Sequence, residues 1–279
     1  MSIIQMKKTF LRDNQHGFTL IELLIGLLAA AAIIYAAMSL YVTQHKQLLV
    51  QDQISDMQAN IRAATEMLAT GIRKAGFNLP DPLYPLETHD TSPDTITVTF
   101  DSGALDGVKS IYDMAGPTDE LRCAHADDIS QLNEGDWAYI YDSNAKIGEF
   151  FQTTRVLAGP PRIQHSTMAL SRNYPAGSDI LKIGRIKFFV DQSDSTHPNL
   201  MIQTYGSAPQ IFAENIIDLN FRYFLADGTI VTQTNTPNEI RMVEIDVLGR
   251  TSSPDPEFFQ DYRTRNFTLR VKVRNLGIG

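Results

Sequence analysis

The sequence contains 279 residues, of which 43% are hydrophobic and 20% are charged, and its formal net charge is −8. This composition is typical of a folded protein of one or two domains, and it disfavours wholesale disorder, a polytopic membrane protein and a general nucleic-acid binder. The single cysteine, Cys123, excludes an intrachain disulfide and any metal site that needs several cysteine ligands.

The N-terminal region has a basic leader followed by a long apolar run. Lys7, Lys8 and Arg12 precede a stretch from residue 23 to residue 42 that carries no formal charge. A helix of that length spans about 30 Å, which is the thickness of the hydrocarbon core of a bilayer. This one apolar run predicts one membrane crossing. The basic residues of the leader predict that the N-terminus stays in the cytoplasm. Glu22 lies at the start of the apolar run, where burying a carboxylate in lipid is costly.

The residues between leader and apolar run form a recognisable motif, Gly-Phe-Thr-Leu-Ile-Glu at positions 17–22. In this context the motif resembles the signature of type IV prepilins and of type II secretion pseudopilins. The resemblance implies that a prepilin peptidase cleaves between Gly17 and Phe18, removes the leader 1–17 and methylates the new N-terminus at Phe18. It also implies that Glu22 pairs with the Phe18 amine of a neighbouring subunit during assembly.

The charge pair is physically reasonable because the freed amine is cationic near neutral pH. Two unit charges about 4 Å apart attract by roughly 4 kcal/mol at an effective dielectric constant of about 20. This attraction is comparable to the cost of hiding the carboxylate in an apolar environment.

The helical pattern continues beyond the apolar run. Apolar residues recur at steps of three or four, no proline interrupts them, and Gly76 is a plausible terminator. The sequence therefore predicts a stem helix over residues 18–76. Its first part, 18–42, is a transmembrane segment and later a filament core, and its second part, 43–76, is amphipathic and packs on a head domain. A signal anchor followed by a coiled-coil stalk is the alternative.

Residues 77–279 show strand periodicity and predict a β-rich, antiparallel head domain on this helix, which makes the fold class α+β. The last two strands should pair and place acidic side chains opposite basic ones on the solvated face. The segment 87–136 is interpreted as loops between short strands. The predicted strands are 95–100, 137–141, 148–157, 180–190, 200–205, 216–225, 239–248 and 266–274.

Four further segments narrow the resemblance to the PilW group of minor pilins, which are related to J-type pseudopilins. They are residues 55–62, 72–77, 213–223 and 271–276. The resemblance implies a pilin-like, non-enzymatic subunit that needs no cofactor, primes pilus assembly and joins a complex at the pilus tip. Its implied partners are the prepilin peptidase, other minor and major pilins, a tip adhesin and, before assembly, inner-membrane lipid. It implies a single-pass inner-membrane protein with a periplasmic head, which later lies at the extracellular pilus tip.

The head shows no catalytic or metal-binding constellation in its sequence. Asp191 and Asp194 lie in a run similar to a calcium loop, but the glycine and the distal glutamate are missing. Cys123 is interpreted either as buried and inert or as available for an intermolecular bond. Neither a nucleophile elbow nor a phosphate-binding loop is present. Beyond the leader, the stem and the head together contain five histidines, scattered without metal-ligand spacing: His45, His89, His125, His165 and His197.

Two other functions fit the sequence less well. A J-type pseudopilin of a type II secretion system shares the N-terminal motif, although such proteins tend to be shorter than this chain. A signal-anchored periplasmic enzyme shares only the membrane anchor.

Overall fold

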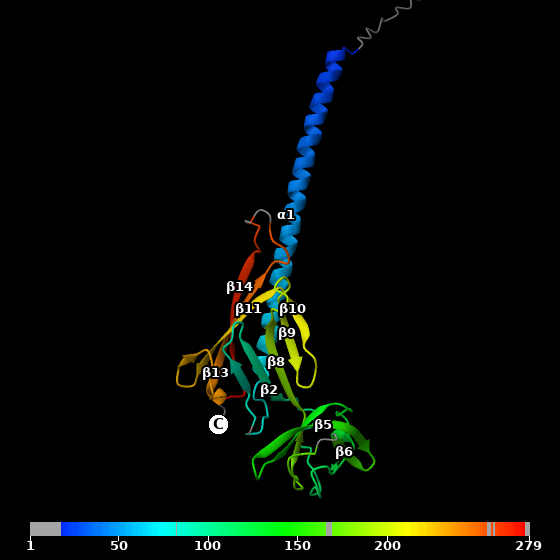
Figure 1. The fold of residues 1–279 in the computed structure, drawn as a ribbon, viewed down its shortest axis with the longest axis vertical. Helices are drawn as coiled ribbons and strands as arrows, with labels where there is room; N and C mark the ends of the chain where they lie inside the picture. The colour runs from blue at the N-terminus through cyan, green and yellow to red at the C-terminus, as the bar shows by residue number, and fades with distance from the viewer. Residues whose placement is uncertain (1–17, 82, 166–168, 256–257, 259, 277–279) are drawn as a thin grey trace, which may run out of the picture. The chain divides into compact units, whose positions relative to one another are not determined.

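A computed structural model describes residues 18–81, 83–165, 169–255, 258 and 260–276. The chain divides into two compact units, Met1–Asp52 and Gln53–Gly279. The described residues contain one long N-terminal helix, α1, and a head built of antiparallel strands (Figure 1). The α+β fold predicted from the sequence is therefore confirmed.

Helix α1 runs from Leu20 to Lys74. Its composition favours a helix because Leu, Ala, Met and Gln are frequent and proline is absent. The helix ends before Gly76, which has a φ of 76°, a left-handed conformation that costs glycine little. The Nδ2 group of Asn275 donates hydrogen bonds of 3.2–3.4 Å to the carbonyls of residues 73–75. The C-terminal end of α1 is thus capped by a residue two hundred positions away in the chain.

In the second unit, one face of α1 is part of the main hydrophobic core. The core joins this face to the inner faces of two sheets. At one point the contact is very close, because a Cβ atom on Gly249 would lie 2.6 Å from Cγ1 of Ile61. The buried core residues of the helix recur with helical spacing: Met57, Ile61, Ala64, Leu68, Ala69 and Ile72.

The described residues form three antiparallel sheets and two short 3₁₀ helices, η1 (Asp127–Ile129) and η2 (Pro237–Glu239). The first sheet has the order β1-β2-β8-β9-β10, with β1 (Leu86–His89), β2 (Thr95–Asp101), β8 (Ile183–Asp191), β9 (Asn199–Thr204) and β10 (Gln210–Glu214). The second has the order β12-β11-β13-β14, with β12 (Ile230–Val231), β11 (Ile216–Leu225), β13 (Ile240–Arg250) and β14 (Thr264–Lys272). The third has the order β3-β6-β5-β4-β7, with β3 (Leu121–Arg122), β6 (Pro161–His165), β5 (Ile147–Ala158), β4 (Trp137–Asp142) and β7 (Asp179–Leu181).

The predicted pairing of the last two strands is confirmed by the register of β13 and β14. Glu244 lies opposite Arg270, and the Arg270 Nε donates to Glu244 Oε2 at 2.5 Å. Arg222 on β11 pairs with the other carboxylate oxygen. The Glu244 side chain is only 3% exposed, so two arginines compensate one buried carboxylate.

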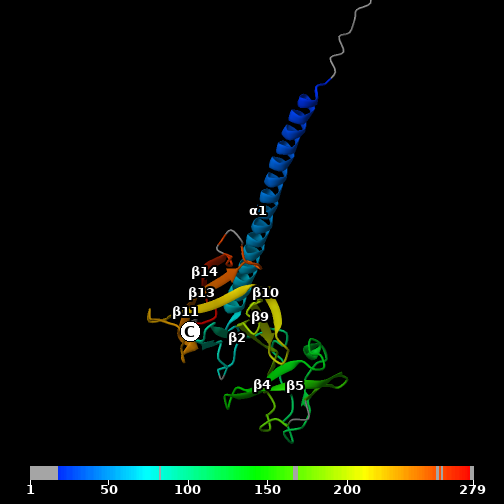
Figure 2. The same ribbon diagram turned by 45° about the horizontal axis from the view of Figure 1, so that its top comes forward.

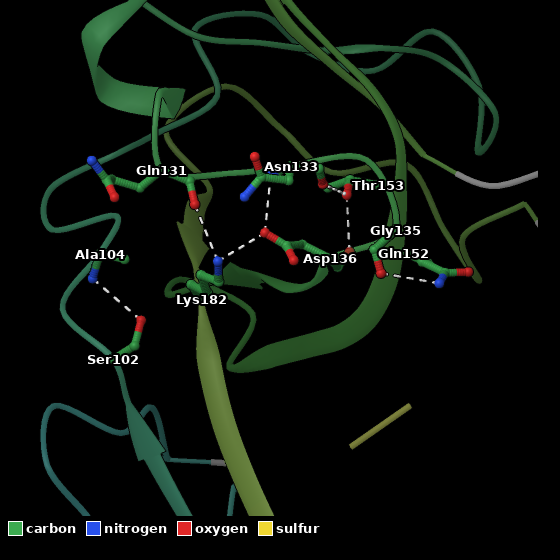
Figure 3. Close-up of polar contacts among 9 residues, drawn as sticks. All are labelled: Ser102, Ala104, Gln131, Asn133, Gly135, Asp136, Gln152, Thr153 and Lys182. Atoms are coloured by element: carbon green, nitrogen blue, oxygen red, sulfur yellow. Dashed lines mark hydrogen bonds and ion pairs between the residues drawn. The ribbon is translucent and has the colours of Figure 1, made fainter. Parts of the chain in front are cut away.

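The third sheet is an insertion between β2 and β8, and it has a hydrophobic core of its own (Figure 2). The Ser102 amide donates to the Lys182 carbonyl at 3.0 Å and closes the base of the insertion. The Lys182 ammonium donates to the Gln131 carbonyl at 3.1 Å and to Asp136 Oδ2 at 2.8 Å, as Figure 3 shows. The prediction of a single strand over 180–190 is wrong, because β7 and β8 belong to different sheets and the chain passes between them at Lys182.

Candidate functional site

The start of α1 carries the residues that the sequence motif singles out. Thr19 directly precedes the helix, and its side-chain Oγ1 accepts a hydrogen bond of 3.3 Å from the Glu22 amide. In return, Glu22 Oε2 accepts from the Thr19 amide at 2.9 Å and from the Thr19 hydroxyl at 2.8 Å. This reciprocal arrangement is a capping box, which satisfies backbone donors that a helix start otherwise leaves free.

The capping box fixes the Glu22 carboxylate at the N-terminal end of the helix dipole, where a negative charge is stabilised. Within the described residues only Oε2 of this carboxylate accepts hydrogen bonds, so Oε1 is available for another donor. In the sequence, Glu22 stands out through the motif and through the cost of burying a carboxylate, and the Thr-x-x-Glu spacing also signals the capping box, which was not predicted.

Of the predicted processing residues, Phe18 is described and Gly17 lies outside the described residues. Phe18 is the residue before the helix cap, and its side chain is 86% exposed. The structure brings Thr19 and Glu22 together, and among the described residues Phe18 and Glu22 form no hydrogen bond or ion pair. A Phe18 amine pairing with Glu22 thus has to be tested between subunits.

The helix beyond the cap is apolar on all sides and solvent-exposed. Every residue from 18 to 49 is exposed, including leucines and isoleucines that folded proteins normally bury. By length and composition this part of α1 is able to cross a membrane. A continuous apolar surface of this size marks a membrane-spanning or helix-packing segment. The helix therefore fits the anchor of a membrane-bound subunit.

The remaining candidates of the head have structural partners. Asp191 accepts from the Ser193 amide at 2.9 Å, and Asp194 accepts from the Thr196 amide at 2.8 Å. Their carboxylates thus close local turns. Among the residues that the structure describes, no group of three or more His, Cys, Asp or Glu side chains could hold a metal ion.

Cys123 is buried, and burial together with the nearby Asp128 raises the pKa of its thiol to about 11. A thiol with such a pKa is almost entirely protonated at neutral pH, and the thiolate is the reactive form. Of the two interpretations made from the sequence, the structure favours an inert core residue over an intermolecular bond.

The fold and the N-terminal segment together define a class of protein: a β-rich head on a long helix whose first part is an exposed apolar anchor. The comparison with protein families then adds one match. A family model described as "Prokaryotic N-terminal methylation motif" matches residues 12–34. No curated protein and no solved structure matches the chain.

The matched segment contains the Gly-Phe-Thr-Leu-Ile-Glu motif at positions 17–22, the capping box and the first part of α1. The chain therefore carries a type IV pilin-like prepilin signal on a pilin-like α+β architecture, which supports a type IV pilin or pseudopilin. The motif implies processing by a prepilin peptidase and assembly with other pilins. It suggests a structural, non-enzymatic subunit anchored in a membrane.

Proposed function

We propose that this protein is a minor pilin of a type IV pilus, which primes assembly and occupies the pilus tip. The observation that carries the proposal is the position of the prepilin signal, directly before a helix that is apolar on all sides and exposed. Such a surface needs a membrane before assembly and the helices of other subunits afterwards. The similarity of four further segments to the PilW group supports a minor pilin of that group.

Processing starts at the bond between Gly17 and Phe18. Glycine offers the peptidase a backbone without a side chain, and the freed Phe18 amine is cationic and becomes methylated. Because the cut precedes the helix, the mature subunit keeps its anchor. The precursor is oriented with its N-terminus in the cytoplasm and its head in the periplasm, as the charges of the leader favour.

In the assembled filament, Glu22 sets the register between the helices of neighbouring subunits. The capping box holds Oε2 at the helix start through Thr19, and Oε1 receives the Phe18 amine of a neighbouring subunit. In an apolar bundle of helices, an unpaired carboxylate is costly, so only the register that pairs it is stable. The head then contacts other minor pilins and a tip adhesin.

The register role predicts a specific defect for Glu22→Val. We expect the variant to be inserted and processed but poorly recovered in sheared filaments, because its helix lacks the counter-charge. Glu66→Val is the matched control, since Glu66 is an exposed glutamate in the second part of the same helix. Normal recovery of Glu22→Val, or an equal loss for Glu66→Val, contradicts the register role.

Deleting the gene separates a pilus from a secretion pseudopilus. We expect surface pili to be lost while protein secretion continues. Intact pili with failed secretion would instead assign the chain to the J-type pseudopilins, which share the N-terminal motif.

A further inference from the structure

A cavity of about 340 Å³ lies in the head at the C-terminal end of α1. Its walls come from the last turn of the helix, the connection that follows, the end of β2 and the segment after β14. Its lining includes Arg73, Lys74, Phe77, Phe100, Arg274 and Asn275. The cavity lies far along the chain from the prepilin signal and from the apolar first part of α1.

Positive charge dominates the cavity. Arg73, Lys74 and Arg274 line it, and none of them belongs to an ion pair in the described part of the chain. The carboxylate of Asp101 accepts instead from Asn78 Nδ2 at 2.7 Å and from the Gly103 amide at 3.0 Å. Three cations therefore line one cavity without a salt-bridge partner among the described residues, in a chain whose net charge is −8.

The usual explanation for cations at this position does not account for all of them. Basic side chains near the end of a helix often interact with its last carbonyls and with the negative end of the helix dipole. Here the Asn275 amide already donates to the carbonyls of residues 73–75. Arg274 lies outside the helix, yet it adds a third charge to the same cavity.

The cavity also has an aromatic wall. Phe77 is 50% exposed, and the Lys74 ammonium lies 5.4 Å from the centroid of the Phe100 ring. Arginine and aromatic side chains are the residues that contribute most to binding energy at protein interfaces. Guanidinium groups bind carboxylates with two parallel hydrogen bonds, which gives both strength and orientation. The cavity volume is at the lower end of the range for small-ligand sites, and it is large enough to admit the carboxylate of a side chain.

We propose that this cavity is a docking site for an acidic segment of a partner protein, whose carboxylates bind to Arg73 and Arg274 while an adjacent apolar group packs on Phe77. That the partner is another subunit of the filament rests on the proposed function. The binding of carboxylates rests only on the cavity.

A labelled peptide with three consecutive glutamates tests the site by fluorescence anisotropy, with the full mature chain purified in detergent. We expect saturable binding that weakens as salt increases, because exposed charges are screened. The double variant Arg73→Gln/Arg274→Gln should lose at least about tenfold in affinity. Arg62→Gln is the matched control and should bind like the wild type, since Arg62 is exposed on the same helix but does not line the cavity.

Both arginines of the double variant are exposed, so its thermal unfolding should match that of the wild type and show that the fold is intact. Unchanged affinity in the double variant would overturn the proposal, as would equal binding of a peptide with glutamine in place of glutamate. Displacement of the peptide by inorganic phosphate at equal concentration would reveal a site for small anions and would also overturn it. The outcome is independent of filament formation: failed peptide binding leaves processing and assembly intact, and a chain that enters no filament can still bind the peptide.

Discussion

The two parts of helix α1 have the same secondary structure but opposite surroundings. From residue 20 to residue 49 every side chain is exposed, whereas from residue 57 to residue 72 one face is buried against the head. Within the exposed part, residues 23–42 are apolar all round, whereas the part that packs on the head is apolar on one side only. Packing on the head explains the one-sided apolar pattern of the second part, and it does not explain the all-round apolar surface of the first. Within the part of the chain that the structure describes, the first part stays uncovered.

Burying the exposed apolar side chains of the anchor releases a large free energy. Burying a leucine, isoleucine or similar side chain contributes about 1.5–3 kcal/mol, and the exposed part of α1 holds many such residues. Among the large hydrophobic side chains of this part, the highest exposed fractions are those of Leu20, Tyr35, Ile33 and Leu28. Membrane insertion followed by packing against other helices recovers this free energy.

The largest expected effect comes from truncating one leucine in each part of the helix. Leu68 is 0% exposed, so Leu68→Ala should destabilise the head by about 2–5 kcal/mol because it leaves a cavity in the core. Leu28 is 67% exposed, so Leu28→Ala should change the unfolding free energy of the head by less than about 0.5 kcal/mol. Denaturant unfolding of the mature chain in detergent measures both. Equal losses would show that the two parts are not distinct.

A pair of glutamates gives the next contrast. Glu244 is buried under Arg222 and Arg270, so Glu244→Gln should destabilise the head by about 1–3 kcal/mol because it removes the charge that both arginines share. Glu22→Gln, at the exposed start of the helix, should leave the unfolding free energy of the head unchanged. Urea titrations of the two variants provide the test. A stable Glu244→Gln head would mean that the arginines find other partners.

A smaller, pH-dependent effect is expected at the base of the inserted sheet. Burial raises the pKa of Asp136, but hydrogen bonds from Lys182 and Asn133 and the Lys182 charge outweigh it, so the pKa lies below its usual value. The carboxylate therefore stabilises the fold above its unfolded pKa of about 3.9, and this contribution is lost as the pH falls through the folded pKa.

Asp136→Asn should accordingly lower the free energy of unfolding by about 1 kcal/mol at pH 7. The effect is small because the Asp136–Lys182 ion pair is partly exposed to solvent. The difference between wild type and variant should shrink on acidification below pH of about 4. Thermal unfolding at several pH values follows it. A difference that does not depend on pH would rule out the Asp136 charge as its source.

The smallest effect is expected at the helix cap. Thr19→Ala removes the hydroxyl that bonds to the Glu22 amide and carboxylate, and loss of a cap costs about 0.5–2 kcal/mol of local helix stability. Amide hydrogen exchange in the first turn should accelerate, while the head melts as before. Thr19→Ser keeps the hydroxyl and should behave like the wild type. Unchanged exchange in Thr19→Ala would mean that the cap is unimportant.

The sequence predicts those features that depend on local periodicity. Alternating apolar residues identify β13 and β14, and the opposite charges of Glu244 and Arg270 even predict their pairing. The long helix and its end near Gly76 follow from composition and from the absence of proline. The Thr19–Glu22 capping box is equally predictable from the sequence, since it depends on a spacing of three residues.

What the sequence does not predict depends on distant contacts. An alternating pattern shows which face of a strand is buried, but not which sheet the strand joins, so the inserted sheet and the break at Lys182 were missed. Likewise, the segments 55–62 and 213–223, which carry the resemblance to minor pilins, meet in the fold. Both line one cavity of about 240 Å³. Asn275, from the last such segment, caps the helix. These residues form contacts between the stem helix and the head. The spacing of residues along the sequence does not reveal such contacts.

If the proposed processing takes place, the mature filament subunit begins at Phe18, just before α1. Intact-mass analysis of the protein from the membranes of cells that contain a prepilin peptidase tests this most directly. We expect a chain that begins at Phe18 and carries one added methyl group. A membrane form that still begins at Met1, with no methylated Phe18 product although the peptidase is present, would contradict it.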